Sequence, residues 1–191
     1  MKTLALTTAL TTALIASLAT GAAFAASHSQ TNPMVGGAAM LPTMDIVDNA
    51  VNSADHTTLV AAVQAAGLVD TLKSDGPFTV FAPVNAAFAA LPDGTVETLL
   101  KPENKATLTK VLTSHVVAGA WSAADIVAAA KSSADGFFHF EAVSGDALSA
   151  QVKGGKVYIF DESGNAALVS IADVNQSNGV IHVIDSVLLP Q

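Results

Sequence analysis

Residues 76–92, GPFTVFAPVNAAFAALP, and residues 178–190, NGVIHVIDSVLLP, decide the fold that this sequence predicts. In the first segment, residues 78–81 are aromatic and β-branched, which is typical of a strand buried on both faces. Pro83 cannot donate a hydrogen bond to a neighbouring strand and is expected to end this one. Asn85 can then cap a short, alanine-rich helix with its side chain. The first segment is therefore predicted to form a strand, a turn and a helix.

The second segment begins with a strong turn signal, Asn178-Gly179, and continues as an apolar run over residues 180–189. Because successive side chains of a strand point to opposite faces, the apolar residues fall on both sides of it. One face would carry Ile181, Val183 and Val187, and the other would carry Val180, His182, Ile184 and Leu188. Such a run predicts an interior strand that is covered on both sides.

Between the two segments lies LTSHVVAG, residues 112–119, with a histidine at His115. In this order and spacing, the two segments and this motif resemble the signature boxes and the central histidine motif of fasciclin-like domains. The resemblance implies an α+β fold, namely a wedge-shaped β-sandwich flanked by several α-helices. It also implies an extracellular adhesion or binding module, here a bacterial secreted protein with one such domain. The boxes resemble core elements of that family, so they identify a fold and not a reacting centre.

The rest of the pattern agrees with an α+β fold, because helical periodicity comes first and strands follow. Helices are predicted around residues 43–51, 59–66, 102–115 and 122–130. Gly67 is expected to end the second of these, and Ser122 with Asp125 has the spacing of a capping box at the start of the last. Residues 148–160 predict a hairpin that turns at Gly154-Gly155.

The beginning of the chain is predicted to be a targeting segment. Lys2 is the only charged residue before Asp45, an apolar stretch follows it, and small residues precede a cleavage point after Ala25. A membrane anchor is the alternative, but the stretch is short for a bilayer span and contains many Thr and Ser residues. We therefore expect a signal peptide over residues 1–25, a flexible lead over 26–42 and the fasciclin-like domain over 43–190, with export to the periplasm or the medium and no membrane span after cleavage.

The composition excludes several classes of function. The formal net charge is −8 and no arginine is present, so a basic surface for nucleic acid is not expected. The chain has no cysteine, which excludes thiol catalysis and thiolate metal sites, so the exported protein must depend on its apolar core. Hydrophobic residues make up 51% of the chain, enough to supply such a core.

The resemblance assigns structural roles to the motif residues His115, Asn178, Gly179 and His182. Many members of the family have a tyrosine before the central histidine, whereas this chain has Ser114. Any adhesion role of that aromatic residue is therefore in doubt here, although the fold is not.

A possible adhesion contact is Asp173-Val174, which stands just before the second box. Animal members of the family carry integrin-recognition segments built around Asp-Ile at the matching positions. The alternative is that Asp173 only caps or turns the chain.

The histidines do not form a reactive arrangement in the sequence. His28 and His56 are expected in solvent-exposed segments, and His139 is expected as a partly buried, hydrogen-bonded ring. Metal-ligand spacing is absent from the sequence, so no metal and no cofactor are expected. A serine hydrolase is the least favoured class, because neighbours such as Ser114 and His115 point to opposite faces of a strand and no G-x-S-x-G motif occurs.

The sequence therefore favours a monomeric, non-catalytic binding module for adhesion or for association with a matrix or surface. Its partner would be a cell-surface protein, a matrix protein or a glycan. The alternative function is a carrier of a small apolar ligand, such as a lipid or glycolipid, in a pocket between the helices and the sandwich.

Overall fold

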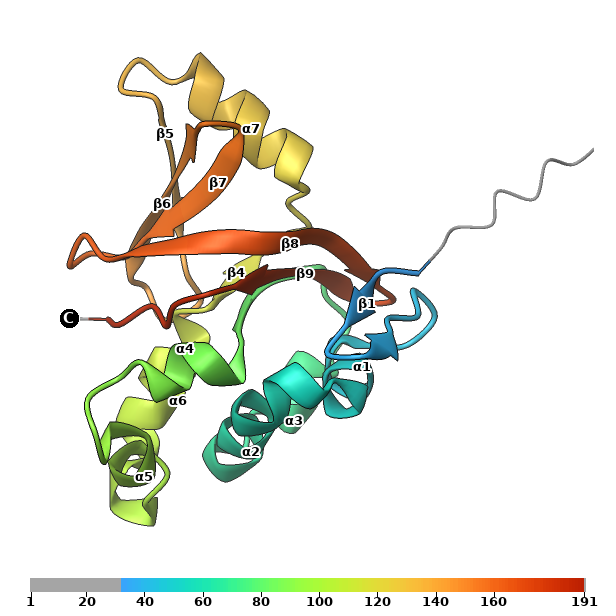
Figure 1. Ribbon diagram of the computed structural model, residues 1–191, viewed down its shortest axis with the longest axis vertical. Helices are drawn as coiled ribbons and strands as arrows, with labels where there is room; N and C mark the ends of the chain where they lie inside the picture. The colour runs from blue at the N-terminus through green and yellow to red at the C-terminus, as the bar shows by residue number, and fades with distance from the viewer. Residues whose placement is uncertain (1–31, 191) are drawn as a thin grey trace, which may run out of the picture. The chain divides into compact units, whose positions relative to one another are not determined.

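The computed structural model describes residues 32–190 (Figure 1). The predicted signal peptide and the first residues of the predicted lead lie outside the described residues. The helices are α1 (Ile46–Asn52), α2 (Thr57–Ala66), α3 (Val69–Leu72), α4 (Asn85–Ala89), α5 (Thr95–Leu99), α6 (Lys105–Thr113) and α7 (Ala123–Ser132), with 3-10 turns at Ala54–His56 and Pro102–Asn104. The strands are β1 (Met34–Val35), β2 (Ala38–Ala39), β3 (Phe78–Pro83), β4 (Val116–Ala118), β5 (Phe137–Glu141), β6 (Ala147–Lys153), β7 (Lys156–Phe160), β8 (Ala166–Gln176) and β9 (Gly179–Ile184).

One sheet of order β4-β3-β9-β8-β7-β6-β5 forms the centre of the folded unit. The β3–β9 pair is parallel and the other pairs are antiparallel. The two ends of the sheet meet, because Val117 bridges to Ala142 and the Val143 N–H donates to the Val116 carbonyl at 2.7 Å. The result is a nearly closed barrel or sandwich with helices packed on it, so the predicted α+β class is confirmed.

Strand β9 separates two hydrophobic cores. Ile181, Val183 and Val187 belong to the core between the sheet and the helices of the first half of the chain. Ile184 and Leu188 belong to a second core on the other side of the strand, which also receives Ile126 of α7. The assignment of these residues to two faces, predicted from their alternation, is confirmed.

Asn178 connects the start of β9 to two helices. Its side-chain oxygen accepts from the Ile46 N–H at 3.1 Å, and its amide nitrogen donates to the Leu72 carbonyl at 2.8 Å and the Ser74 carbonyl at 3.1 Å. The Asn178 carbonyl accepts from the Phe78 N–H at 3.1 Å, where β3 begins. One side chain thus ties the first turn of α1 and the end of α3 to the parallel strand pair.

Part of the predicted flexible lead is folded. Residues 33–40 form a β1–β2 hairpin whose Val35 and Met40 side chains are buried in the first core. The Gly36 carbonyl accepts from the Ala54 N–H at 3.1 Å. This part of the lead therefore belongs to the folded unit, because it covers apolar surface that would otherwise face water.

Asn85 caps a different helix from the one that the sequence predicted. The N-cap of α4 is Val84, without a side-chain hydrogen bond. The Asn85 side-chain oxygen instead accepts from the Thr58 N–H at 3.0 Å, in the first turn of α2. Pro83, which was expected to stop the strand, is itself the last residue of β3.

Gly179 allows β3 and β9 to approach each other at their first residues. A Cβ atom at this position would lie within 3.0 Å of the Phe78 carbonyl oxygen, a contact that real structures do not tolerate. We predict that Gly179→Ala lowers the free energy of unfolding by about 2–4 kcal/mol through backbone displacement. The exposed neighbour Ser177→Ala is the control, and urea unfolding is the measurement. Equal stability of the two variants would contradict the close approach.

Candidate binding site

The ring of His115 joins α6 to the end of the chain. Its Nδ1–H donates to the Val111 carbonyl at 2.7 Å, and its Nε2 accepts from the Leu188 N–H at 2.9 Å. These partners require the neutral ring, because a proton on Nε2 would face another N–H group. Burial lowers the pKa of His115 to about 4, which agrees with that geometry.

The ring of His182 also binds two backbone groups, but its proton is on Nε2, whereas that of His115 is on Nδ1. Its Nε2–H donates to the Trp121 carbonyl at 2.8 Å, and its Nδ1 accepts from the Asp173 N–H at 3.3 Å. The ring also stacks on Phe81 at a centroid distance of 5.7 Å. Burial lowers the pKa of His182 as well. Both motif histidines therefore hold backbone groups with both of their ring nitrogens.

Asp173 lies at an irregular point of β8, where the register with β9 shifts. Its backbone adopts φ +57°, and its carboxylate accepts from the Ala123 N–H at 2.7 Å, in the first turn of α7. The residue is exposed, whereas Val174 beside it is 0% exposed and packs in the first core. Of the two predicted contact residues, Asp173 alone is available at the surface.

Other polar residues differ from their sequence predictions. His56, expected in solvent, is only 3% exposed and its Nδ1 lies 2.9 Å from the Ser53 hydroxyl. His139, expected to be partly buried, has a side chain that is 64% exposed and hydrogen-bonds to Asp135 at 2.8 Å. Val35 and Met40 of the β1–β2 hairpin lie around the same small cavity as His56. Strand β5, which carries His139, lies at an end of the sheet order. Neither arrangement has a local sequence signal.

Ser114 does not pair with its neighbour His115. It lies at the end of α6, and its hydroxyl is 2.7 Å from the Asp146 carboxylate, which in turn meets the Lys110 ammonium at 3.4 Å. Because Ser114 is buried and the ring nitrogens of His115 have backbone partners, the two residues are not arranged as a nucleophile and its base.

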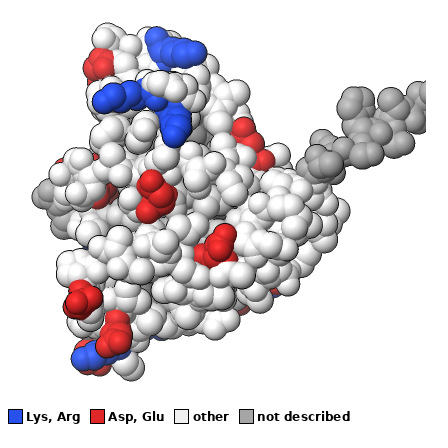
Figure 2. All heavy atoms as spheres, in the orientation of Figure 1, with Lys and Arg blue, Asp and Glu red and all other residues white. Residues whose placement is uncertain are grey.

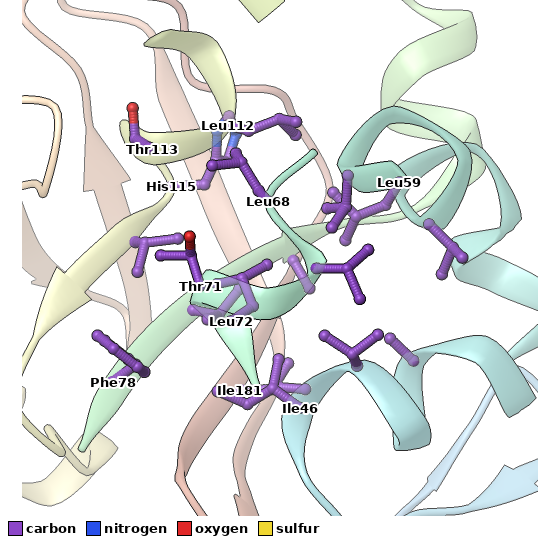
Figure 3. Close-up of a pocket in the computed structure, with 18 of the residues that line it drawn as sticks. Ile46, Leu59, Leu68, Thr71, Leu72, Phe78, Leu112, Thr113, His115 and Ile181 are labelled. Carbon is purple, nitrogen blue, oxygen red and sulfur yellow. The ribbon is translucent and has the colours of Figure 1, made fainter. Parts of the chain in front are cut away.

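An apolar pocket of about 70 Å³ lies between the helices of the first half and strands β3 and β9 (Figure 3). Its lining includes Ile46, Leu59, Leu72, Phe78, Leu112 and Ile181. Val143, which is 50% exposed, is also part of the lining. The carbon-rich lining favours apolar groups and offers few polar partners to anything else.

A family model described as fasciclin domain matches residues 54–190. The chain belongs to the fasciclin domain family. It is 49% identical to protein sll1483 of Synechocystis sp., over 85% of this chain and 82% of the relative. It is 37% identical to immunogenic protein MPB70 of Mycobacterium bovis, over 74% of this chain and 66% of the relative.

Longer relatives also match this fasciclin domain. The transforming growth factor-beta-induced protein ig-h3 of Sus scrofa is 37% identical over 69% of this chain, but only 17% of that protein is covered. Among solved structures, the FAS1 domain pair of the insect cell adhesion molecule Fasciclin I matches with a TM-score of 0.68 and 18% identity, over 76% of this chain and 51% of that one. At that identity the likeness establishes the fold alone.

Residues 32–190 contain no helix that is both long and apolar enough to cross a membrane. The same residues contain no group of three or more His, Cys, Asp or Glu side chains placed to hold a metal ion.

The neutral histidines of this fasciclin domain predict a loss of stability in acid. His115 stays neutral in the folded state, whereas the unfolded chain takes up a proton near pH 6.5, so its contribution is complete above pH 6.5 and is lost as the pH falls towards 4. The pKa difference corresponds to about 3 kcal/mol between pH 7 and 4.

Urea unfolding at a series of pH values should therefore show a shallower acid dependence for His115→Gln than for the wild type. His139→Gln, which changes an exposed ring, is the control and should keep the wild-type slope. If His115→Gln does not fold, NMR titration of the His115 ring in the wild type supplies the same information. A ring that titrates near pH 6.5 would contradict the prediction.

Proposed function

We propose that this chain is a non-catalytic binding module that acts outside the cytoplasm, in adhesion or in association with a cell surface or matrix. The observation that carries the proposal is the hydrogen bonding of the two motif histidines, His115 and His182. All four ring nitrogens of His115 and His182 bind backbone groups, and two of these groups, at Leu188 and Trp121, lie far away in the sequence. We infer that the motif supports the fold and leaves recognition to surface residues. Family membership agrees with this function, and so does the insect cell adhesion molecule whose domain pair has the same fold.

Export supports the same proposal from the sequence. Residues 1–25 have the single positive charge, the apolar stretch and the small residues of a cleavable signal peptide. Cleavage would deliver an acidic, cysteine-free domain to the periplasm or the medium. Its partner there would be a surface protein, a matrix protein or a glycan, and the domain itself would be a monomer.

The surface that we propose for this contact is centred on Asp173. The carboxylate is exposed where β8 meets the start of α7. The residue lies at the irregular point of β8 and has a left-handed backbone conformation, with φ +57°. Asn adopts this conformation as readily as Asp and retains the side-chain oxygen that accepts from the Ala123 N–H. Asp173→Asn therefore removes the charge and preserves the shape.

Retention of the purified protein on intact cells of its source, and on polysaccharide and protein fractions of their surface, tests the proposal. We expect the wild type to be retained and Asp173→Asn to be retained several-fold less, because it has lost a charged hydrogen-bond acceptor. Asp93→Asn, another exposed acidic residue, is the control. No retention of the wild type on any fraction would contradict the adhesion function. Equal retention of Asp173→Asn would move the contact elsewhere on the surface.

The apolar pocket favours a second candidate function, the carriage of a small apolar ligand. At about 70 Å³ it is smaller than a cavity of ~150 Å³ that binds benzene, so an acyl chain would need the lining near Val143 to open. Native mass spectrometry of the protein purified from its source should show a retained apolar ligand if the domain is a carrier. Val63→Ile, which adds a methyl group to the lining, should reduce that occupancy, and ligand-free protein in every preparation would exclude the carrier.

A further inference from the structure

Strands β7 and β8 pair over only part of their length. The paired residues run from Tyr158 opposite Leu168 to Phe160 opposite Ala166. Strand β7 begins two residues before this paired part, at Lys156, and β8 continues beyond it to Gln176. From Val169 onwards, β8 is paired with β9 on one side and has no β7 partner on the other. The two strands therefore diverge, and one side of β8 is left without a neighbouring strand.

The two ends of the seven-stranded sheet meet at one point. β4 and β5, the two ends of the strand order, are connected through the Val117–Ala142 bridge and the Val143 N–H bond to Val116. Helix α7 also packs against β5 and β6. The diverging part of β8 is a place where the sheet can accept another extended backbone.

A groove of about 590 Å³ lies at this divergence, between α7, the start of β7 and the open side of β8. Its lining includes Ala124, Val127, Lys156, Val169, Ser170 and Ala172. Small and aliphatic side chains dominate, so an extended chain can approach the strand closely. Residues 169–172 span about 13 Å, which is the length of four residues of a strand.

Lysines surround one end of the groove. Lys156 is part of the lining, Lys153 is its cross-strand partner at the β6–β7 turn, and Lys131 stands in the last turn of α7. All three are exposed, and no ion pair of the described residues involves them. Figure 2 shows basic side chains gathered over α7 and the β6–β7 turn, on a chain whose net charge is −8. Asp173 lies at the opposite end, next to Ala172 and the start of α7.

We propose that this groove binds an extended peptide segment of a partner protein as an additional strand along β8, with acidic side chains of the segment against Lys153 and Lys156. Backbone hydrogen bonds to the open side of β8 supply affinity in this mode of recognition, and side chains at the ends supply register. The lysines favour acidic side chains on the segment, because the β6–β7 turn attracts negative charge. This inference rests on the proposed binding function and names the class of partner.

The probes are two synthetic peptides, EETVTVT and TVTVTEE, with acidic residues at either end of a strand-forming sequence, and their lysine counterparts KKTVTVT and TVTVTKK. We expect at least one of the two acidic peptides to bind the full protein and to shift the NMR amide signals of residues 168–172. Its lysine counterpart should bind at least about tenfold more weakly. Lys153→Gln with Lys156→Gln should weaken binding of the acidic peptide about tenfold, because two exposed ion pairs are lost. Ala124→Trp, which fills the groove from an exposed helix position, should abolish binding.

The matched controls lie in α6 and in the segment just before it. Lys101→Gln with Lys105→Gln removes the same charge, and Ala106→Trp adds the same bulk to exposed positions that do not line the groove, so both should bind as the wild type does. Equal binding of acidic and basic peptides, no binding at millimolar peptide, or binding unaffected by Ala124→Trp would overturn the inference. If dodecyl phosphate shifts the same amide signals and the acidic peptide does not bind, the inference is overturned in favour of an anionic amphiphile.

The same variants are also tested for retention on cells. Retention of the wild type without peptide binding would overturn this inference and leave the binding function intact. Peptide binding without retention on any surface fraction would leave the groove as a peptide site and contradict the adhesion function.

Discussion

The parallel pairing of β3 with β9 is the constraint on which the rest of the structure depends. It joins segments about a hundred residues apart, so the entropy of closing a long loop opposes it, and burial on both faces of the strands must offset that cost. Gly179 removes the Cβ that would prevent the approach, and Asn178 connects the strand pair to α1 and α3. The helical half and the sheet half of the chain therefore become one unit at this pair.

The two buried histidines extend this arrangement to the ends of other elements. His115 connects α6 with the segment after β9, and His182 connects β9 with the bulge of β8 and the approach to α7. Each ring is both donor and acceptor, which only the neutral form permits. The same bonds place Asp173 at the N-terminus of α7, so the core motif determines the shape of an exposed surface. In this domain the two buried histidines therefore help to position an exposed surface.

Local signals predicted much of the fold. The alternation in residues 180–188 assigned Ile181 and Ile184 to different cores, and the capping box of Ser122, the left-handed Gly67 and the Gly154-Gly155 turn occur as predicted. What the sequence could not predict depends on contacts between distant segments. Asn85 caps α2 because the chain returns there, and His56 is buried in a part of the core that also receives the β1–β2 hairpin. The burial of Val174 beside the exposed Asp173 follows from the register shift in β8, and the groove beside β8 follows from its divergence from β7, which no periodicity records.

Amide hydrogen exchange measured by NMR on the folded protein tests this account most directly. If the β3–β9 pair holds the two halves together, amides of residues 79–82 and 180–184 should exchange only through global unfolding, with protection equal to the free energy of unfolding. Amides on the open side of β8 between Val169 and Ala172 should exchange much faster through local opening. Faster exchange in β3 and β9 than in the β6–β7 hairpin would show that the sheet half is stable without the parallel pair, and would contradict the account.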